Sequence, residues 1–250
     1  VPDGCRVIGY TWVFKIKNRE DGSIARYKAR ICVDGSKQKH GIDYDQTFAP
    51  VANATTIRLV LAIAASKGLH MRQYDVETAF LASMIDKPVY MRAPRGAGGE
   101  TGQAWLLLRS LYGLKQAPRL FNTHLNKNLH KHGFTQSLLD PCLYHRFKTG
   151  TETYLAVVVD DILLATNSAS YAKQFEADLG SVYKLKLLGK PAYMVGMQLG
   201  HYSDKLTVCQ NRYIADVAKR FGESNPVPTR TPANVSVSLV RTGIARKPPS

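Results

Sequence analysis

Two adjacent carboxylates interrupt an otherwise apolar stretch, AVVVDDILLA at 156–165. The chain carries no Lys, Arg or His between Lys148 and Lys173, so no neighbour in the sequence can neutralise Asp160 and Asp161. Buried, unpaired charges are costly, whereas a divalent cation binds oxygen ligands without help from a lysine. These residue types therefore predict a metal site at the rim of a core.

A third carboxylate would hold such a metal better. Asp75 is the best candidate because it ends the short strand-like segment MRQYD. Two divalent ions about 3.5–4 Å apart suit in-line phosphoryl transfer, in which one ion activates the attacking hydroxyl and the other stabilises the leaving oxygen. A single aspartate is more often a turn residue or a helix cap, so this prediction depends on all three acids meeting.

The segment around the acid pair is compatible with two arrangements. Either one strand runs through the pair, or two strands, 154–159 and 162–166, meet at a hairpin whose tip carries both acids. The patterns elsewhere predict an α+β fold with helices on one face of an antiparallel sheet. Helices are expected at 55–68, 117–132, 168–180 and 210–221, and strands at 71–75, 143–147, 192–199 and 205–208.

A further β-hairpin is predicted near the start of the chain, from strands at 11–17 and 24–33 around the turn residues Asp21 and Gly22. Its register pairs Lys17 with Arg26, Lys15 with Lys28 and Val13 with Arg30. Because side chains alternate between the two faces along a strand, Lys15, Lys17, Arg26, Lys28 and Arg30 all lie on one face. Like charges opposed across strands are destabilising. The face therefore predicts a polyanionic ligand, and a solvated sheet face is the alternative.

The overall charge agrees with a polyanionic partner. The 250 residues include 34 Lys and Arg against 19 Asp and Glu, a net charge of +15, which favours nucleic acid or an acidic membrane over a merely basic soluble protein. The four cysteines are scattered without CxxC spacing, so reduced intracellular thiols are expected rather than zinc. We expect no signal peptide and no transmembrane segment, and a first residue of Val suggests a piece of a longer product.

Several words of the sequence, taken together, resemble the reverse transcriptase domain of copia-type long-terminal-repeat retrotransposons. The resemblance covers about residues 8–232. The words are WVFKIK (12–17), YKAR (27–30), QTFAPVA (46–52), YDVETAFL (74–81), VYM (89–91), SLYGLKQAPR (110–119), VDDILLA (159–165) and YIADVAKRFG (213–222). SLYGLKQAPR is highly specific for this family, whereas VDD alone is a weak signal.

The resemblance implies a right-hand polymerase fold, α+β, whose fingers and palm contain an antiparallel sheet backed by helices. Within a domain at 1–232, it places the fingers at about 1–70 and 88–120 and the palm at about 71–87 and 121–190. The primer grip and the start of a thumb would occupy about 191–232, and the tail 233–250 is unassigned.

The resemblance also implies roles for particular residues. Asp75, Asp160 and Asp161 would be the catalytic acids that bind two Mg²⁺ ions, for which Mn²⁺ can substitute. Arg30, with Lys15 or Lys17, would grip the incoming triphosphate. The remaining implied positions are Val76 and Gly113 at the nucleotide, Phe80 excluding a ribose 2′-hydroxyl, Lys186 as a general acid on pyrophosphate, and Gly196 and Met197 in the primer grip.

The function implied is RNA-directed DNA polymerisation, which adds deoxynucleoside triphosphates to a DNA primer on an RNA or DNA template. The family places this domain in a polyprotein with protease, integrase and ribonuclease H, inside cytoplasmic virus-like particles. The chain departs from the family pattern at Val158, Ala82-Ser83, Leu187, Pro191 and Met194. A degenerate, inactive remnant that retains the fold and nucleic-acid binding is therefore the alternative. A third hypothesis is an unrelated metal-dependent phosphotransferase or nuclease. The motifs assigned to the fingers and the motif SLYGLKQAPR argue against it.

Overall fold

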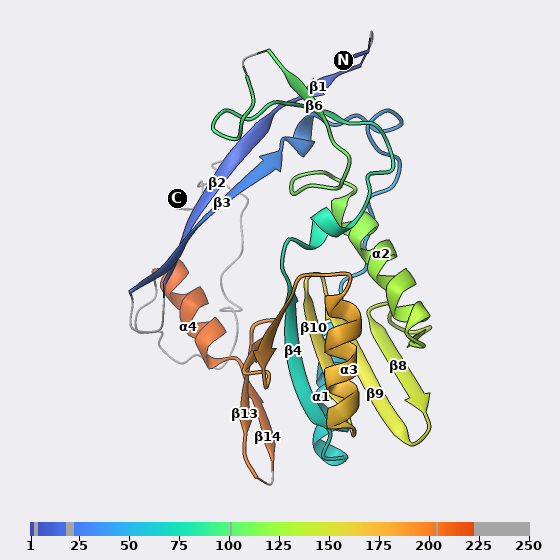
Figure 1. Ribbon diagram of the computed structural model, residues 1–250. Helices are drawn as coiled ribbons and strands as arrows, with labels where there is room; N and C mark the ends of the chain where they lie inside the picture. The colour runs from blue at the N-terminus through green and yellow to red at the C-terminus, as the bar shows by residue number, and fades with distance from the viewer. Residues whose placement is uncertain (3–4, 19–22, 101, 204, 223–250) are drawn as a thin grey trace, which may run out of the picture.

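The computed structural model describes residues 1–2, 5–18, 23–100, 102–203 and 205–222 (Figure 1). The predicted turn at Asp21 and Gly22 and the tail 233–250 lie outside the described residues. Among the helices of the described ranges, none is long and apolar enough to span a membrane.

The centre of the molecule is a six-stranded sheet with the order β11-β4-β10-β9-β8-β7, and every neighbouring pair in it is antiparallel. The antiparallel sheet is as predicted. Its strands are β4 (His70–Val76), β7 (Thr135–Gln136), β8 (Leu143–Lys148), β9 (Thr151–Val158), β10 (Asp161–Thr166) and β11 (Leu185–Gly189).

The acid pair lies at a hairpin tip, so the second of the two arrangements open from the sequence is the one observed. Val158 pairs with Asp161 across β9 and β10, and Val159 and Asp160 form the connecting turn. Val159 has a φ of 57°, a left-handed conformation that a β-branched side chain rarely adopts. Backbone strain of this kind tends to occur at functional sites.

Helices cover both faces of this sheet, which corrects the prediction of helices on one face. Helices α2 (Ala117–Lys131) and α3 (Ala169–Gly180) pack on one face around Tyr74 and Ile162, whereas α1 (Ala54–Ser66) packs on the other against Leu163. In Figure 1, α3 lies in front of the sheet and α1 behind it. The physical reason is that 162–165 of β10 are fully buried, so both sides of the strand need a cover.

Local signals explain where the helices begin. The Asn53 side chain accepts a hydrogen bond from Thr55 N at the start of α1, and the Ser168 hydroxyl accepts one from Tyr171 N at the start of α3. Pro118 occupies the first turn of α2, where its missing N–H costs nothing. The helices predicted at 55–68, 117–132 and 168–180 are confirmed within two residues at each end.

The basic hairpin consists of β2 (Tyr10–Asn18) and β3 (Ile24–Val33), and its register is the predicted one. Lys17 pairs with Arg26, Lys15 with Lys28 and Val13 with Arg30. The hairpin extends from a small sheet of β1 (Val7–Ile8), β5 (Tyr90–Arg92) and β6 (Ala104–Leu106) (Figure 1). Short 3₁₀ helices follow β3 and β4, at η1 (Gly35–Lys37) and η2 (Ala79–Ala82).

The C-terminal part of the described chain differs from the prediction of two strands at 192–199 and 205–208. The first of these segments is broken at Val195 and Gly196, whose φ values are 48° and 75°. The result is a three-stranded sheet of β12 (Tyr193–Met194), β13 (Met197–His201) and β14 (Leu206–Cys209). Helix α4 (Asn211–Arg220) follows as predicted, with none of its residues buried.

A polar joint, formed by Gln38, Gly113, Lys115 and Gln116, fastens the base of the hairpin to α2, and the side chains of Gln38 and Gln116 in it are buried. The Gln38 Nε2 donates to Gln116 Oε1 at 2.9 Å, and Gln116 Nε2 donates to the Asp43 carbonyl at 2.9 Å. Lys115 N donates to Gln38 Oε1 at 2.7 Å. Gly113 has a φ of 92°, and a Cβ there would lie 2.0 Å from the Val33 carbonyl oxygen, so only glycine fits.

Candidate active site

Antiparallel pairing of β4 with β10 gathers acids at one end of the central sheet. Asp161 is the cross-strand partner of Asp75, and Asp160 precedes it in the turn. The Val76 N–H donates a 2.8 Å hydrogen bond to the Asp160 carbonyl, which holds this turn against the end of β4. Two segments that are distant in the sequence thus deliver their acids to one place.

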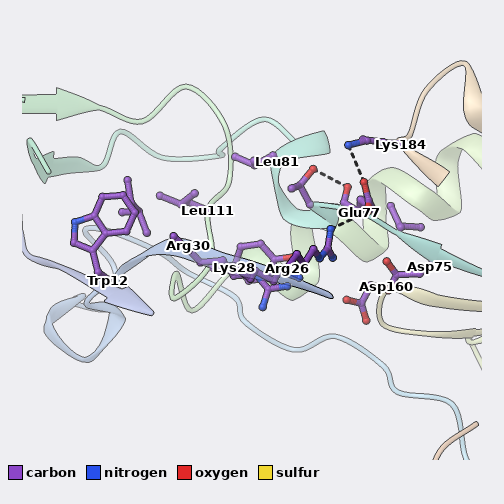
Figure 2. Close-up of a pocket in the computed structure, with 15 residues that line it drawn as sticks. Trp12, Arg26, Lys28, Arg30, Asp75, Glu77, Leu81, Leu111, Asp160 and Lys184 are labelled. Atoms are coloured by element: carbon purple, nitrogen blue, oxygen red, sulfur yellow. Dashed lines mark hydrogen bonds and ion pairs between the residues drawn. The ribbon is translucent and has the colours of Figure 1, made fainter. Parts of the chain in front are cut away.

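A cleft of about 470 Å³ lies between this end of the sheet and the basic hairpin. Asp75 and Asp160 line it from the sheet, and Arg26, Lys28 and Arg30 line it from β3 (Figure 2). Acids facing a row of cations across a cavity suit a polyphosphate ligand that arrives with metal ions.

Asp75, Asp160 and Lys28 of this cleft have no ion-pair partner among the described residues. Burial, followed by the negative charge of Asp160, raises the pKa of Asp75, although Lys28 and Lys186 oppose this rise. On the hairpin side, burial lowers the pKa of Lys28, and the neighbouring cations, Arg30 first, lower it further. A bound cation would stabilise the acids and a bound polyanion would stabilise the bases.

Asp161 has a different environment from the other two acids. Its half-buried side chain does not line the cleft, and burial followed by the charge of Asp160 raises its pKa. Gln73 Nε2 donates to Asp161 Oδ1 at 3.5 Å and to the Tyr193 carbonyl of β12 at 3.3 Å. Gln73 therefore connects this acid to the β12–β13 hairpin.

A magnesium ion fits the two acids of the cleft better than it fits a set of three. Within the described parts of the chain, no group of three or more His, Cys, Asp or Glu side chains is placed to hold a metal ion. Mg²⁺ needs no such protein cage, because it commonly binds one or two carboxylates together with substrate phosphates and water. Asp75 and Asp160, with their uncompensated charge, are suitable ligands of this kind.

An aromatic side chain closes the cleft between the hairpin and the sheet. The Arg30 guanidinium lies 4.8 Å from the centre of the Tyr112 ring, which lines the cleft. The Phe80 ring packs behind it, 4.7 Å from Tyr112, and does not itself line the cleft. Val76 lines the cleft, whereas Gly113 lies in the joint.

Three predicted lysines lie near the cleft without lining it. Lys15 and Lys17 pair with Lys28 and Arg26 on the hairpin, but the cleft is lined from the β3 side of each pair. Lys186 lies in β11 opposite Asp75, and its side chain is exposed. Its positive charge reaches Asp75, because it lowers the pKa of that carboxyl.

The two predicted primer-grip residues have separate environments. Gly196 lies in the tight turn between β12 and β13. The Met197 side chain is buried under the central sheet, in the cluster that contains Leu163 and α1. Neither residue lines the cleft, and Gln73 is the described side chain that ties their hairpin to the acids.

Residues 1–235 match the family described as reverse transcriptase (RNA-dependent DNA polymerase). The chain belongs to the reverse transcriptase family. It is 37% identical over 237 residues to the Pol polyprotein of transposon TNT 1-94 from Nicotiana tabacum, covering 93% of this chain and 18% of that protein. It is 34% identical over 240 residues to the Pol polyprotein of transposon RE1 from Arabidopsis thaliana, covering 95% of this chain and 16% of that protein.

These relatives are copia-type retrotransposon polyproteins, and this reverse transcriptase chain spans less than a fifth of the length of either. Among solved structures, a foamy viral protease-reverse transcriptase in complex with double-stranded DNA aligns with 87% of this chain and 34% of that one. The sequence identity is 15% and the TM-score is 0.39.

Sequence reasoning missed several residues of the cleft in this reverse transcriptase domain. Arg26 and Lys28 belong to the predicted basic face, but neither was assigned to the nucleotide. Tyr112, Glu77 and Lys184 also line the cleft, and no role was predicted for them. Two of the three could have been suspected from position, because Tyr112 precedes Gly113 and Glu77 follows Asp75 by two residues.

Proposed function

We propose that this chain is an RNA-directed DNA polymerase that adds deoxynucleotides to a primer 3′-hydroxyl on an RNA or DNA template. The observation that carries the proposal is the cleft itself. Asp75 and Asp160 line it from one side, and Arg26, Lys28 and Arg30 line it from the other (Figure 2). A nucleoside triphosphate has the charge and the length to interact with both sides at once.

The acids would hold divalent metal, which reverse transcriptases generally use. Asp75 and Asp160 are the proposed ligands for Mg²⁺ or Mn²⁺, and Asp161 supports them from the adjacent position. When bound, such ions activate the attacking hydroxyl and stabilise the charge on the phosphates.

In the proposed reaction the primer 3′-oxygen forms a bond to the α-phosphorus while the bond from that phosphorus to the bridging oxygen breaks, and pyrophosphate leaves. Lys28, Arg30 and Arg26 would bind and orient the phosphates, and positioning with electrostatic stabilisation would supply most of the rate. Lys186, opposite Asp75, remains the proposed proton donor to pyrophosphate. Phe80 would exclude the ribose 2′-hydroxyl indirectly, because its ring packs against Tyr112, which lines the cleft.

The larger assignments are also proposals. The hairpin and the small sheet would be fingers, the six-stranded sheet with its helices the palm, and β12 to α4 the primer grip and the start of a thumb. The template–primer would contact the protein mainly through its backbone, so binding should weaken steeply with salt. The domain would act within an intracellular polyprotein that carries protease, integrase and ribonuclease H, as the family resemblance of its sequence implies.

A second candidate function is a catalytically weak remnant that keeps nucleic-acid binding. One observation favours it: the Asp161 side chain contacts Gln73 and does not line the cleft with the other two acids.

Primer extension on an RNA template with Mg²⁺ or Mn²⁺ separates these functions. We expect extension by the chain and none by Asp160→Asn. Asp178→Asn is the matched control, because Asp178 lies on α3, pairs with His132 and is remote from the cleft lining. Equal signal from the chain and Asp160→Asn would overturn the proposed mechanism. Template binding without extension by the chain would identify the remnant.

A further inference from the structure

One acidic side chain of the cleft has no part in the chemistry described above. Among the described residues that line the cleft, the acids are Asp75, Asp160 and Glu77, and the cations are Arg26, Lys28, Arg30 and Lys184. Glu77 thus places a negative charge inside a cavity whose proposed ligand is a polyanion. Such a charge opposes ligand binding unless it has a separate purpose.

Contacts to the palm hold Glu77 in place. The Lys184 Nζ lies 2.8 Å from Glu77 Oε2, and the Glu77 N–H donates to the Lys184 carbonyl at 2.9 Å. Backbone and side chain together fix the charge at the cleft.

Glu77 also reaches the fingers hairpin. Its Oε1 lies 4.0 Å from Arg26 Nη1, and Figure 2 shows Glu77 between Lys184 and the basic residues of β3. Solvent and ligand can reach both cations, because the side chains of Lys184 and Arg26 are 78% and 55% exposed. A carboxylate that contacts both cations makes the contacts that a phosphate oxygen would make in the same place.

We propose that Glu77 occupies Arg26 and Lys184 in the nucleotide-free chain and that the incoming triphosphate displaces it. This inference rests on the proposed polymerase function and adds a determinant of nucleotide affinity to it. The carboxylate connects fingers to palm before the nucleotide arrives, and phosphate takes over that connection afterwards. Because only the displaced state binds tightly, the apparent affinity for nucleotide is reduced by the fraction of chains in which the ion pairs are intact.

The expected effect is modest, since exposed ion pairs are weak. Glu77→Gln removes the charge with little change of shape, and we expect it to tighten nucleotide binding about two- to fivefold. The measurement is the dissociation constant of the complementary deoxynucleoside triphosphate, with Mg²⁺, on a template–primer whose primer ends in a dideoxynucleotide. That terminus permits binding and prevents bond formation. Thermal melting of each variant verifies its folding.

Glu152→Gln is the matched control. Glu152 also pairs with one lysine, Lys67, on the surface outside the cleft lining, so its loss changes the net charge equally and should leave nucleotide affinity unchanged. A double-mutant cycle tests whether Glu77 acts through its ion pair with Arg26. If Glu77 acts partly through Arg26, the gain from Glu77→Gln should shrink in an Arg26→Gln background.

The outcomes separate this inference from the function on which it rests. If the unchanged chain binds template–primer but no nucleotide, the proposed polymerase function fails and the inference fails with it. If the chain binds nucleotide and Glu77→Gln binds it equally or more weakly, only the role of Glu77 is overturned. Tighter binding by Glu77→Gln and Glu152→Gln alike would also overturn it, because the effect would then reflect net charge alone.

Discussion

Two polar regions lie beneath the basic hairpin, and they differ in whether their polar groups have partners. In the joint, Gln38 and Gln116 are buried and hydrogen-bond to each other and to backbone. In the cleft, Asp75 and Asp160 repel each other, and the cations of β3 do the same. The two glutamines of the joint have their partners within the protein, whereas Asp75, Asp160 and Lys28 of the cleft have no ion-pair partner among the described residues.

This difference indicates that the joint stabilises the fold and that the cleft binds a ligand. Buried polar groups with complete hydrogen bonding specify one arrangement of the elements around them. Burial and neighbouring like charge, which together raise the pKa of Asp75 and lower that of Lys28, reduce stability and indicate that a ligand supplies the missing charges. SLYGLKQAPR, the most specific motif of the sequence, supplies Gly113, Lys115 and Gln116 to the joint and Tyr112 to the cleft. The weaker motif VDD supplies Asp160 to the cleft.

The largest expected effect comes from the cleft. Asp75→Asn should lower primer extension about a thousandfold, because it removes a proposed metal ligand. Its free energy of unfolding at neutral pH should stay equal or rise. The raised pKa of Asp75 in the folded chain means that its contribution to stability falls as pH rises through that pKa.

Urea unfolding of the chain and of Asp75→Asn between neutral and acidic pH tests the second half of this prediction. The two curves should converge at acidic pH, where the carboxyl is protonated in both folded and unfolded states. A variant that is clearly less stable than the chain at neutral pH would mean that Asp75 is a structural residue, and the contrast between the regions would disappear.

The joint should give the largest loss of stability. Gly113→Ala adds a Cβ 2.0 Å from the Val33 carbonyl oxygen at a φ of 92°, and we expect a loss of about 3 kcal/mol in the free energy of unfolding. Gly98→Ala is the control, because its φ is 81° and nothing lies within 4 Å of the added carbon. It should lose about 1 kcal/mol. Equal losses would refute the close approach.

The hydrogen bonds of the joint should contribute somewhat less. Gln116→Leu leaves Gln38 and the Asp43 carbonyl without their partner, and should lower the free energy of unfolding by about 2 kcal/mol. Gln103→Leu, which removes two exposed hydrogen bonds with Glu100, should change it by less than about 0.5 kcal/mol. A neutral Gln116→Leu would show that the network is not needed for stability.

The smallest effect compares two lysines that face each other on the hairpin. Lys28 lines the cleft and its partner Lys15 does not. Lys28→Ala should raise the nucleotide KM about tenfold, the value of one charge-assisted contact, and Lys15→Ala should change it less than about twofold. Steady-state primer extension measures both. Equal effects would place the triphosphate along the whole basic face.

Much of the fold followed from local signals. The Asp-Gly dipeptide predicted the register of the basic hairpin, because a two-residue turn there would allow only one pairing of the flanking strands, and the observed pairs Lys17–Arg26 and Lys15–Lys28 match it. Asn53, Ser168 and Pro118 lie where helix-start rules place such residues. The packing of α1 on the second face of the sheet was harder to predict. A continuous apolar run such as 162–165 indicates burial but not which elements provide it.

The hairpin turn at 159–160 was one of two arrangements compatible with the sequence, and the turn at 195–196 was not predicted, for one shared reason. Val159 and Val195 both adopt left-handed backbone conformations, at φ values of 57° and 48°, which turn rules reserve for Gly, Asn and Asp. In the site, the acids were recognisable by type, but Glu77, Tyr112 and Lys184 reach the cleft only through tertiary packing. Tyr112 and Glu77 lie next to predicted site residues in the sequence, whereas nothing in the position of Lys184 distinguishes it from a surface lysine.

Nucleotide-dependent metal binding is the most direct test of the claim that Asp75 and Asp160 share a metal ion with substrate phosphate. Electron paramagnetic resonance can follow Mn²⁺ binding to the chain on a dideoxy-terminated template–primer, with and without the complementary triphosphate. We predict tight Mn²⁺ binding that requires the nucleotide and that is lost in the Asp75→Asn/Asp160→Asn double variant. Undiminished, nucleotide-dependent Mn²⁺ binding by that variant would contradict the account.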